Sequence, residues 1–223
     1  MKVKEIVERV RLAIDEQVEN DSEFLNKSTD EENLTAVIID KIRYALIYVI
    51  ENAPDEKLDS SMLTEVTVED GTVTVGQCVK VKLPQDVLRV MSARLSSWSL
   101  SPVPITEYSQ EYLMQQDEYA RGSWDRPVTA IVYKGTDRYL ELYSAKTSED
   151  TVSVSCIKTP SVADAATMQE NLDTDVSIPA RLESAVIYQI AGLTMVAFRE
   201  DIASSLFTIA QRYMQTNQSQ DAA

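Results

Sequence analysis

The first fifty residues carry the apolar periodicity of α-helices. Apolar residues recur at every third or fourth position from Val3 to Val18, with charged residues between them, and this spacing predicts an amphipathic helix. A second and wider apolar face runs from Leu34 to Ile50, between the capping side chains of residues 28–32 and Pro54. The two helices should form an antiparallel hairpin, whose remaining apolar side must be covered by another element.

Near Ser60 the spacing of apolar residues changes from a helical period of 3.6 residues to a strand period of 2 residues, which continues to Pro160. Apolar alternation predicts strands at residues 66–69, 72–75, 78–82, 87–95, 128–133, 139–143 and 151–158. Asp70-Gly71 separates the first two of these, and this dipeptide favours the two-residue turn of a β-hairpin. Residues 107–119 predict a short helix, followed by an exposed loop over residues 121–127.

Helical periodicity returns near the C-terminal end. Leu182 to Ala197 is apolar almost all round, which indicates a central helix, and Pro179 stands near its start. A last helix begins at about Asp201. The residues between Thr159 and Val176 are acidic and lack sustained periodicity, so they predict a long surface connection.

These patterns predict an α+β fold with an inserted domain. Residues 1–58 and 177–214 should form one helical bundle, and residues 59–160 a small antiparallel β-sandwich or rolled sheet within it. Residues 161–176 are expected to be an extended loop, and residues 215–223 a flexible tail. We expect the first and last helices to share a core, because the two N-terminal helices cannot bury each other's apolar faces alone.

Composition narrows the classes of function. The 223 residues include 21 Lys and Arg against 36 Asp and Glu, a formal charge of -15. Such a charge repels phosphate backbones and anionic membranes, which argues against broad nucleic-acid binding. The sequence shows no signal peptide and no apolar stretch that could span a membrane, which predicts a soluble protein made in the cytoplasm. Cys78 and Cys156 are expected to be buried free thiols.

Motifs of catalysis are missing from the sequence. It contains no histidine, no glycine-rich phosphate loop, no metal-ligand spacing and no nucleophile motif. The acidic pairs Asp55-Glu56 and Glu200-Asp201 fall at predicted helix ends, where solvated carboxylates are common. We therefore expect no enzyme activity, no metal and no cofactor.

One segment concentrates the residue types that dominate protein interfaces. Aromatic rings and guanidinium groups bury large areas and form hydrogen bonds at the rim of an interface. The candidate interface residues are Tyr108, Tyr112, Tyr119, Arg121, Trp124 and Arg126. Two other interpretations stay open: the tyrosines cover one end of the sandwich, or the segment is an aromatic platform for nucleic acid, which the surrounding carboxylates disfavour.

The order of elements resembles that of phage head-tail connectors. The likeness consists of an N-terminal helical pair, a strand block introduced by Leu83-Pro84-Gln85-Asp86-Val87, and a middle stretch with Glu118-Tyr119-Ala120-Arg121. It continues with a late strand that leads into Lys158-Thr159-Pro160, and with Ile178-Pro179 before a long helix. These neck adaptors, gatekeeper or ring proteins lie beneath the portal of tailed phages.

The resemblance implies a non-enzymatic structural virion protein. Such a protein forms a homo-oligomeric ring, commonly of twelve subunits, in the neck between capsid and tail. Its partners are the portal protein and a tail or second neck ring protein, and DNA passes through the ring without specific binding. Two alternatives remain, namely a small cytoplasmic protein-binding adaptor module and, with least support, a metal-dependent hydrolase that uses acidic residues.

Overall fold

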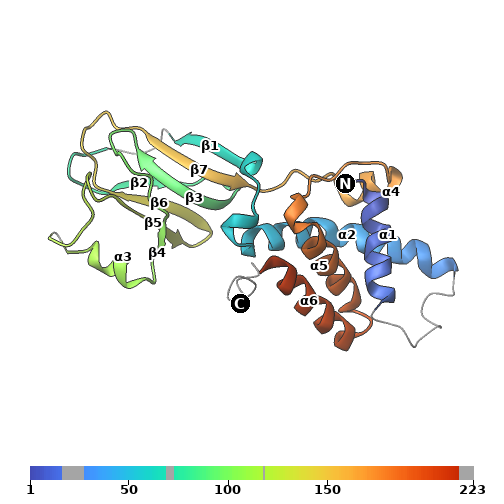
Figure 1. Cartoon of the computed structure of the whole chain (residues 1–223). Coiled ribbons are helices and arrows are strands. Elements are labelled where there is room, and N and C mark those ends of the chain that lie inside the picture. The colour runs from blue at the N-terminus through green and yellow to red at the C-terminus, as the bar shows by residue number, and fades with distance from the viewer. Residues whose placement is uncertain (17–27, 69–72, 118, 216–223) are drawn as a thin grey trace, which may run out of the picture. The chain divides into compact units, whose positions relative to one another are not determined.

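The computed structural model describes residues 1–16, 28–68, 73–117 and 119–215 (Figure 1). The chain divides into two compact units, each described here by itself. The helical unit comprises Met1–Asp59 and the chain from Pro160 onward, and the β unit comprises Ser60–Thr159. The fold class is α+β, as the sequence predicts.

The helical unit is built around one central helix. Its elements are α1 (Val3–Asp15), α2 (Ser28–Asn52), a 3-10 turn (Asp55–Lys57), α4 (Ala165–Glu170), a 3-10 turn (Ala180–Leu182), α5 (Glu183–Met195) and α6 (Glu200–Met214). The central helix α5 contacts α1, α2 and α6 (Figure 1). Helices from both ends of the chain therefore share one core, which confirms the prediction made from their apolar faces.

The apolar spacing of each helix explains this packing. On α1 the buried residues are Val3, Ile6, Val7, Val10, Ala13 and Ile14, at the three- and four-residue intervals of one helix face. On α5 burial extends around almost the whole helix. Gly192 on α5 allows the closest approach, because a Cβ atom at this position would lie 2.5 Å from the ring of Phe207 on α6.

The prediction of an extended loop over residues 161–176 is wrong in its middle. Residues Ala165–Glu170 form α4, and the side chain of Asp164 caps this helix by accepting a 2.8 Å hydrogen bond from the Thr167 amide. Met168 is its one buried anchor, with 2% of its surface exposed. A helix of six residues with a single apolar anchor produces no sustained periodicity, so the sequence pattern did not reveal it.

The chain after α4 is also held in place. The amides of Val3 and Lys4 donate to the carbonyls of Thr174 and Leu172, at 3.0 and 2.9 Å, and the Val176 amide donates to Met1 O at 2.8 Å. This segment is therefore part of the helical unit and not a free arm.

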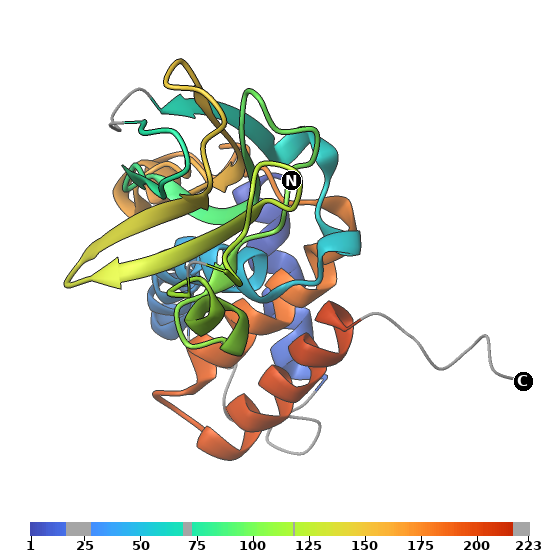
Figure 2. The same ribbon diagram turned by 90° about the vertical axis from the view of Figure 1, so that its left-hand side faces the viewer.

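The β unit is a sandwich of two sheets. Its strands are β1 (Leu63–Val68), β2 (Val79–Lys82), β3 (Val87–Leu95), β4 (Ile105–Thr106), β5 (Val128–Lys134), β6 (Asp137–Tyr143) and β7 (Val152–Lys158). One sheet has the order β1-β7-β3 and the other β2-β6-β5-β4, with only β4 and β5 parallel. Alternate residues of both sheets fill the core between them, among them Val81, Leu95, Leu140 and Val154. In Figure 2 the β5–β6 hairpin is the long yellow pair of strands.

The predicted hairpin around Asp70-Gly71 is wrong in its second strand. Strand β1 pairs with β7, from Leu63↔Ile157 to Val68↔Val152, whereas residues 73–75 are not in a strand and lead into a turn at Gly76 with φ of 74°. Asp70-Gly71 itself lies outside the described residues. Pairing with the distant strand β7 places β1 in the sandwich, and this tertiary arrangement overrides the local turn signal.

Within the described ranges, no helix combines the length and the apolar character needed to cross a membrane. Cys156 is buried and Cys78 half-buried, and both thiols are free.

Candidate interaction surface

The candidate interface residues lie in the connection from β4 to β5. This connection contains α3 (Gln110–Met114), which begins where Ser109 Oγ accepts a 3.2 Å hydrogen bond from the Tyr112 amide. Only Tyr112 belongs to this helix, since Tyr108 precedes it and Tyr119 follows it. The short helix predicted within residues 107–119 is present, but it is limited to Gln110–Met114. The buried side chain of Gln115 explains the early end, because its Oε1 accepts a 2.7 Å bond from the Gly122 amide and draws the chain back.

Tyr112 faces the sheet. Its hydroxyl donates a 3.2 Å hydrogen bond to Glu141 on β6. Glu141 is buried, with only 2% of the residue exposed. Its carboxylate also accepts 2.6 Å hydrogen bonds from the Tyr143 hydroxyl and from Nζ of Lys80. Lys80 is the direct cross-strand neighbour of Glu141 on β2. Three donors thus satisfy a buried carboxylate, and one of them fastens α3 to the sheet.

These contacts decide the charge states at this position. Burial acts to raise the pKa of Glu141, but hydrogen bonds from Lys80, Tyr143 and Tyr112 outweigh it, so the pKa lies below its ordinary value. Burial, followed by the bond to Glu141, raises the pKa of Tyr143 far above that of a free phenol. Burial and the Glu141 charge raise the pKa of the Cys78 thiol to about 11. Cys78 is accordingly a protonated thiol and a poor nucleophile at neutral pH.

Trp124 stands on a closed four-residue turn. The backbones of Ser123 and Arg126 exchange hydrogen bonds of 3.1 and 3.0 Å, and the Ser123 hydroxyl donates to the Asp125 carboxylate. Trp124 follows Ser123 in this turn and is 49% exposed. The Lys146 ammonium lies 4.2 Å from the centre of the indole ring, a cation–π contact that favours this orientation of the ring.

The base of this turn is fixed to the sandwich on two sides. The Gly122 amide donates to Gln115, and its carbonyl accepts a 3.0 Å bond from the Ser144 hydroxyl. A Cβ atom at Gly122 would lie 2.9 Å from Val128, so glycine permits this close approach. The backbone of this turn is therefore fixed in advance, so the turn would lose little conformational entropy on binding a partner.

Asp150 organises the loop that carries Lys146. Its carboxylate accepts bonds of 3.0 and 3.1 Å from the amides of Lys146 and Thr147, and a 2.8 Å bond from the Ser97 hydroxyl. Ser96 Oγ and the Ser97 amide also donate to it. Burial acts to raise the pKa of Asp150, but these bonds outweigh it, so its pKa lies below the ordinary value.

The six candidates thus separate into different roles. Trp124 and Arg126 share the exposed turn, whereas Tyr108 and Tyr119 are 87% and 98% exposed outside it. Arg121 is half-buried, and its Nε finds no hydrogen-bond partner among the described residues. Tyr112 is an anchor of α3, which agrees with the interpretation of a tyrosine covering the sheet.

Sequence reasoning missed the residues that support this surface. Glu141 interrupts the apolar run of β6, and four consecutive residues, Leu140 to Tyr143, are buried. Burial on both faces of a strand means that something covers its outer face, here α3. The charged residue within this apolar run could have indicated the covering segment, because a buried charge requires hydrogen-bond partners.

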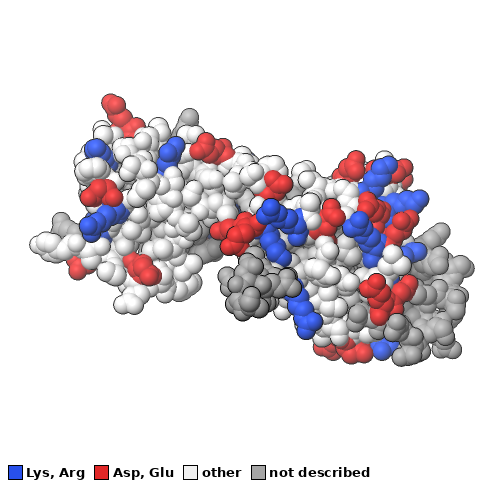
Figure 3. All heavy atoms as spheres, viewed as in Figure 1, with Lys and Arg blue, Asp and Glu red and all other residues white. Residues whose placement is uncertain are grey.

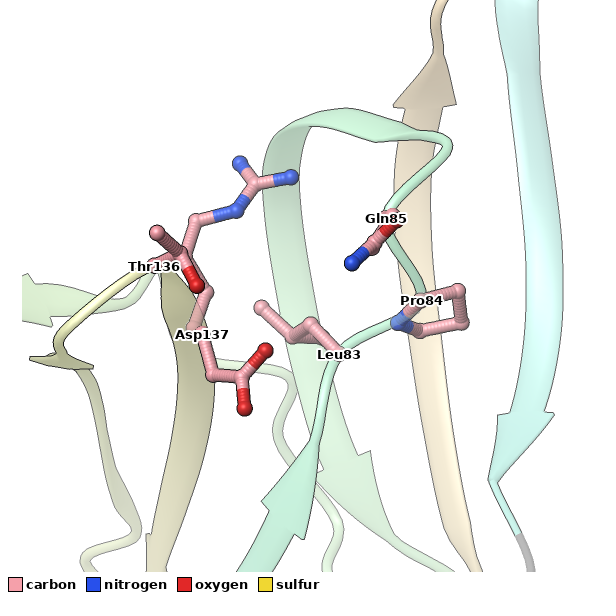
Figure 4. Close-up of a pocket in the computed structure, with 6 residues that line it drawn as sticks. Leu83, Pro84, Gln85, Thr136 and Asp137 are labelled. Atoms are coloured by element: carbon pink, nitrogen blue, oxygen red, sulfur yellow. The ribbon is translucent and has the colours of Figure 1, made fainter.

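The sequence motif Leu83-Pro84-Gln85-Asp86 has a structural role. It forms the turn that leads from β2 in one sheet to β3 in the other. Asp86 forms a 2.8 Å ion pair with Lys158, and its carbonyl accepts a 2.7 Å bond from the Thr159 amide. A surface hollow of about 230 Å³ lies here, with Leu83 between Pro84 and Gln85 on one side and Thr136 and Asp137 on the other (Figure 4). These contacts join parts of the sandwich to one another.

The two acidic pairs lie at the starts of helices. Asp201 forms a 3.2 Å ion pair with Arg199 at the start of α6, and Asp55-Glu56 occupies the first turn of a 3-10 helix. In the part of the chain that the structure describes, no group of three His, Cys, Asp or Glu residues could hold a metal ion.

Charge is divided unequally between the two units. Residues 1–59 and 160–223 contain 11 Lys and Arg against 23 Asp and Glu, whereas residues 60–159 contain 10 against 13. Most of the negative charge therefore belongs to the helical unit. On the face shown in Figure 3 the β unit has broad areas without charged side chains.

Comparison with other proteins finds no family model and no curated protein that matches this chain.

Proposed function

We propose that the chain is a structural subunit of a tailed-phage neck, where copies form a ring that joins the portal to the tail and continues the DNA channel. The observation that best supports a role in assembly is the fixed turn of residues 123–126 with its half-exposed Trp124. The indole ring exposes apolar area to water, and its backbone and its contact with Lys146 at 4.2 Å fix its position before any partner binds. Both properties are typical of an interface anchor.

The place in the neck rests on the resemblance of the sequence to connector proteins. Supporting it is the α+β architecture, in which both ends of the chain form a helical unit and the residues between them form a β-sandwich. The negative charge of -15 also fits, because a negative wall lets DNA pass without binding it. The helical unit, with the greater share of that charge, is the part suited to line such a channel.

The decisive experiment measures the mass of the assembly. Size-exclusion chromatography with light scattering is run on the purified chain alone and on the chain mixed with its portal protein. We expect a ring, alone or on the portal, that electron microscopy shows with a central hole. A chain that stays monomeric in both samples contradicts the proposal and favours the monomeric adaptor module.

A further inference from the structure

The helical unit has an open trench between α1 and α6. A hollow of about 220 Å³ lies there, and its apolar lining comprises Leu12 and Ala13 of α1, Ile187 and Tyr188 of α5, and Tyr213 of α6. These five residues define the trench. Leu12 is 61% and Tyr213 46% exposed, while Ala13 and Ile187 are buried beneath them. Arg9 and Glu16 of α1 and Ser184 of α5 also line the hollow, and the Tyr188 hydroxyl donates a 3.3 Å hydrogen bond to Glu16, so the wall formed by α1 is partly polar.

The trench is the side of α5 that the unit's other helices leave open. This helix contacts α1, α2 and α6, and along it only Ser184 is fully exposed, with Tyr188 half-exposed one turn later. Both residues line the hollow. A further helix placed here would complete the packing around α5, as an amphipathic helix does in an apolar groove.

One end of the trench is basic, although the chain as a whole is acidic. A second hollow of about 340 Å³ shares Tyr213 with the first and is also lined by Lys57, Ile209 and Arg212. Lys57 Nζ donates to the carbonyls of Tyr213 and Gln215, at 2.5 and 2.8 Å. Among the described residues, no carboxylate forms an ion pair with Lys57 or Arg212. An occupant with an acidic flank would add a carboxylate to these two cations, one of which already donates to backbone carbonyls.

The same unit presents a ridge of matching character on another helix. Tyr44 and Tyr48 of α2 lie one turn apart and are 63% and 40% exposed. Asp40 stands one turn before Tyr44, and Glu51 lies on the same helix face after Tyr48. These four residues define the ridge. It shares no residue with the trench, and it combines exposed aromatic rings with two carboxylates, of which Asp40 forms a 2.8 Å ion pair with Lys41 and Glu51 is exposed.

We propose that the ridge of one copy packs into the trench of the next copy, with an acidic flank of the ridge against Lys57 and Arg212. Ridge and trench are different surfaces of one subunit, so each copy offers one of each. Contacts of this heterologous kind continue from copy to copy and close into a ring when the rotation allows it. The inference rests on the proposed function and names the surface through which subunits associate.

The test uses two variants of the full chain that each lose one surface. The ridge variant carries Tyr44→Ser with Tyr48→Ser, and the trench variant carries Leu12→Asp. All three residues are exposed, so the variants should keep the fold, which circular dichroism checks. A variant with Tyr133→Ser, an exposed tyrosine of β5, serves as the matched control.

We expect each variant alone to lose the large assembly, whereas the Tyr133→Ser control retains it. An equimolar mixture of the two variants should form heterodimers and nothing larger, because only one intact ridge and one intact trench can meet. Raising the salt concentration should weaken the assembly of the unchanged chain by screening the charged end.

Two results would overturn the inference while leaving the ring itself in place: full-size assembly of the ridge variant, or a mixture that yields no heterodimer although the unchanged chain assembles. An unchanged chain that remains monomeric with and without the portal contradicts the proposed function as well. The two failures are therefore distinguishable by light scattering.

Discussion

The hydroxyl of Tyr112 on α3 lies 3.2 Å from the carboxylate of Glu141 on β6, and it connects an exposed surface segment to a buried charge. Through this bond the position of α3 depends on the sheet. The turn with Trp124 follows α3 and is joined to it through Gln115 and Gly122. The candidate interface is therefore supported by hydrogen bonds that lie beneath it.

Removing that bond should loosen the segment without unfolding the unit. We expect Tyr112→Phe to lower stability by about 1 kcal/mol, the usual net value of one hydrogen bond. Amide hydrogen exchange in residues 107–126 should become faster, while exchange in β6 and β7 changes little. Tyr119→Phe is the matched control, since Tyr119 is 98% exposed and its exchange pattern should equal that of the unchanged chain. Equal exchange in both variants would contradict an anchoring role for Tyr112.

The acid stability of the protein should depend on Asp150. Its pKa is depressed in the folded state, so its contribution is fully present above the unfolded value of about 3.9 and is lost as the pH falls through the lower folded value. At pH 7, Asp150→Asn should cost roughly 2 kcal/mol, because charge-assisted hydrogen bonds are weakened. Between pH 7 and pH 3, the melting temperature of this variant should fall less steeply with decreasing pH than that of the unchanged chain.

The neighbouring Glu149 provides the control for this measurement. It is exposed. Glu149→Gln should therefore leave the stability at pH 7 and the fall of the melting temperature toward pH 3 close to those of the unchanged chain. An Asp150→Asn curve parallel to that of the unchanged chain would show that Asp150 has the same proton affinity in both states.

The contact between α5 and α6 should not tolerate a larger residue at Gly192. Alanine favours helices over glycine by about 1 kcal/mol, yet its Cβ atom would lie 2.5 Å from the Phe207 ring. We expect the overpacking to prevail and Gly192→Ala to lower stability by roughly 1 to 3 kcal/mol. Adding Phe207→Leu should restore part of the loss in a denaturant titration. A more stable single variant would mean that the two helices can separate at no cost.

Assembly should depend on the turn that holds Trp124. Trp124→Ala with Arg126→Ala should leave the isolated subunit folded, because both side chains are exposed, and should weaken association with the adjoining ring by a few kcal/mol. Particles with this double change should retain DNA poorly or lack tails. The control is Tyr133→Ala with Arg94→Ala, which changes an exposed ring and an exposed guanidinium elsewhere on the sandwich. Particles of normal infectivity from both double variants would contradict the role of the turn.

Helix positions and most strands follow from local pattern, since apolar spacing reports which face of an element is buried. The strand predicted at residues 87–95 coincides with β3, and the predicted span 128–133 differs from β5 by one residue. The pairing of β1 with β7 could not be read in this way, because their residues lie about 90 positions apart. Local turn chemistry at Asp70-Gly71 indicated a nearer partner.

The candidate site was predictable in composition but not in arrangement. Aromatic and arginine residues mark the segment, yet the sequence does not tell that Tyr112 turns inward while Trp124 turns outward. That difference depends on Glu141 and Lys146, which belong to distant parts of the chain and act through hydrogen bonding and a cation–π contact. The small helix α4 escaped detection because one buried methionine carries its packing.

The insertion of the β-sandwich between α2 and α4 also determines the order in which the protein can form during synthesis. All residues of the β unit leave the ribosome before α5, so the sandwich can fold while α1 and α2 still lack the helix around which they pack. The apolar faces of α1 and α2 therefore lack the helix that covers them throughout the translation of residues 53–182.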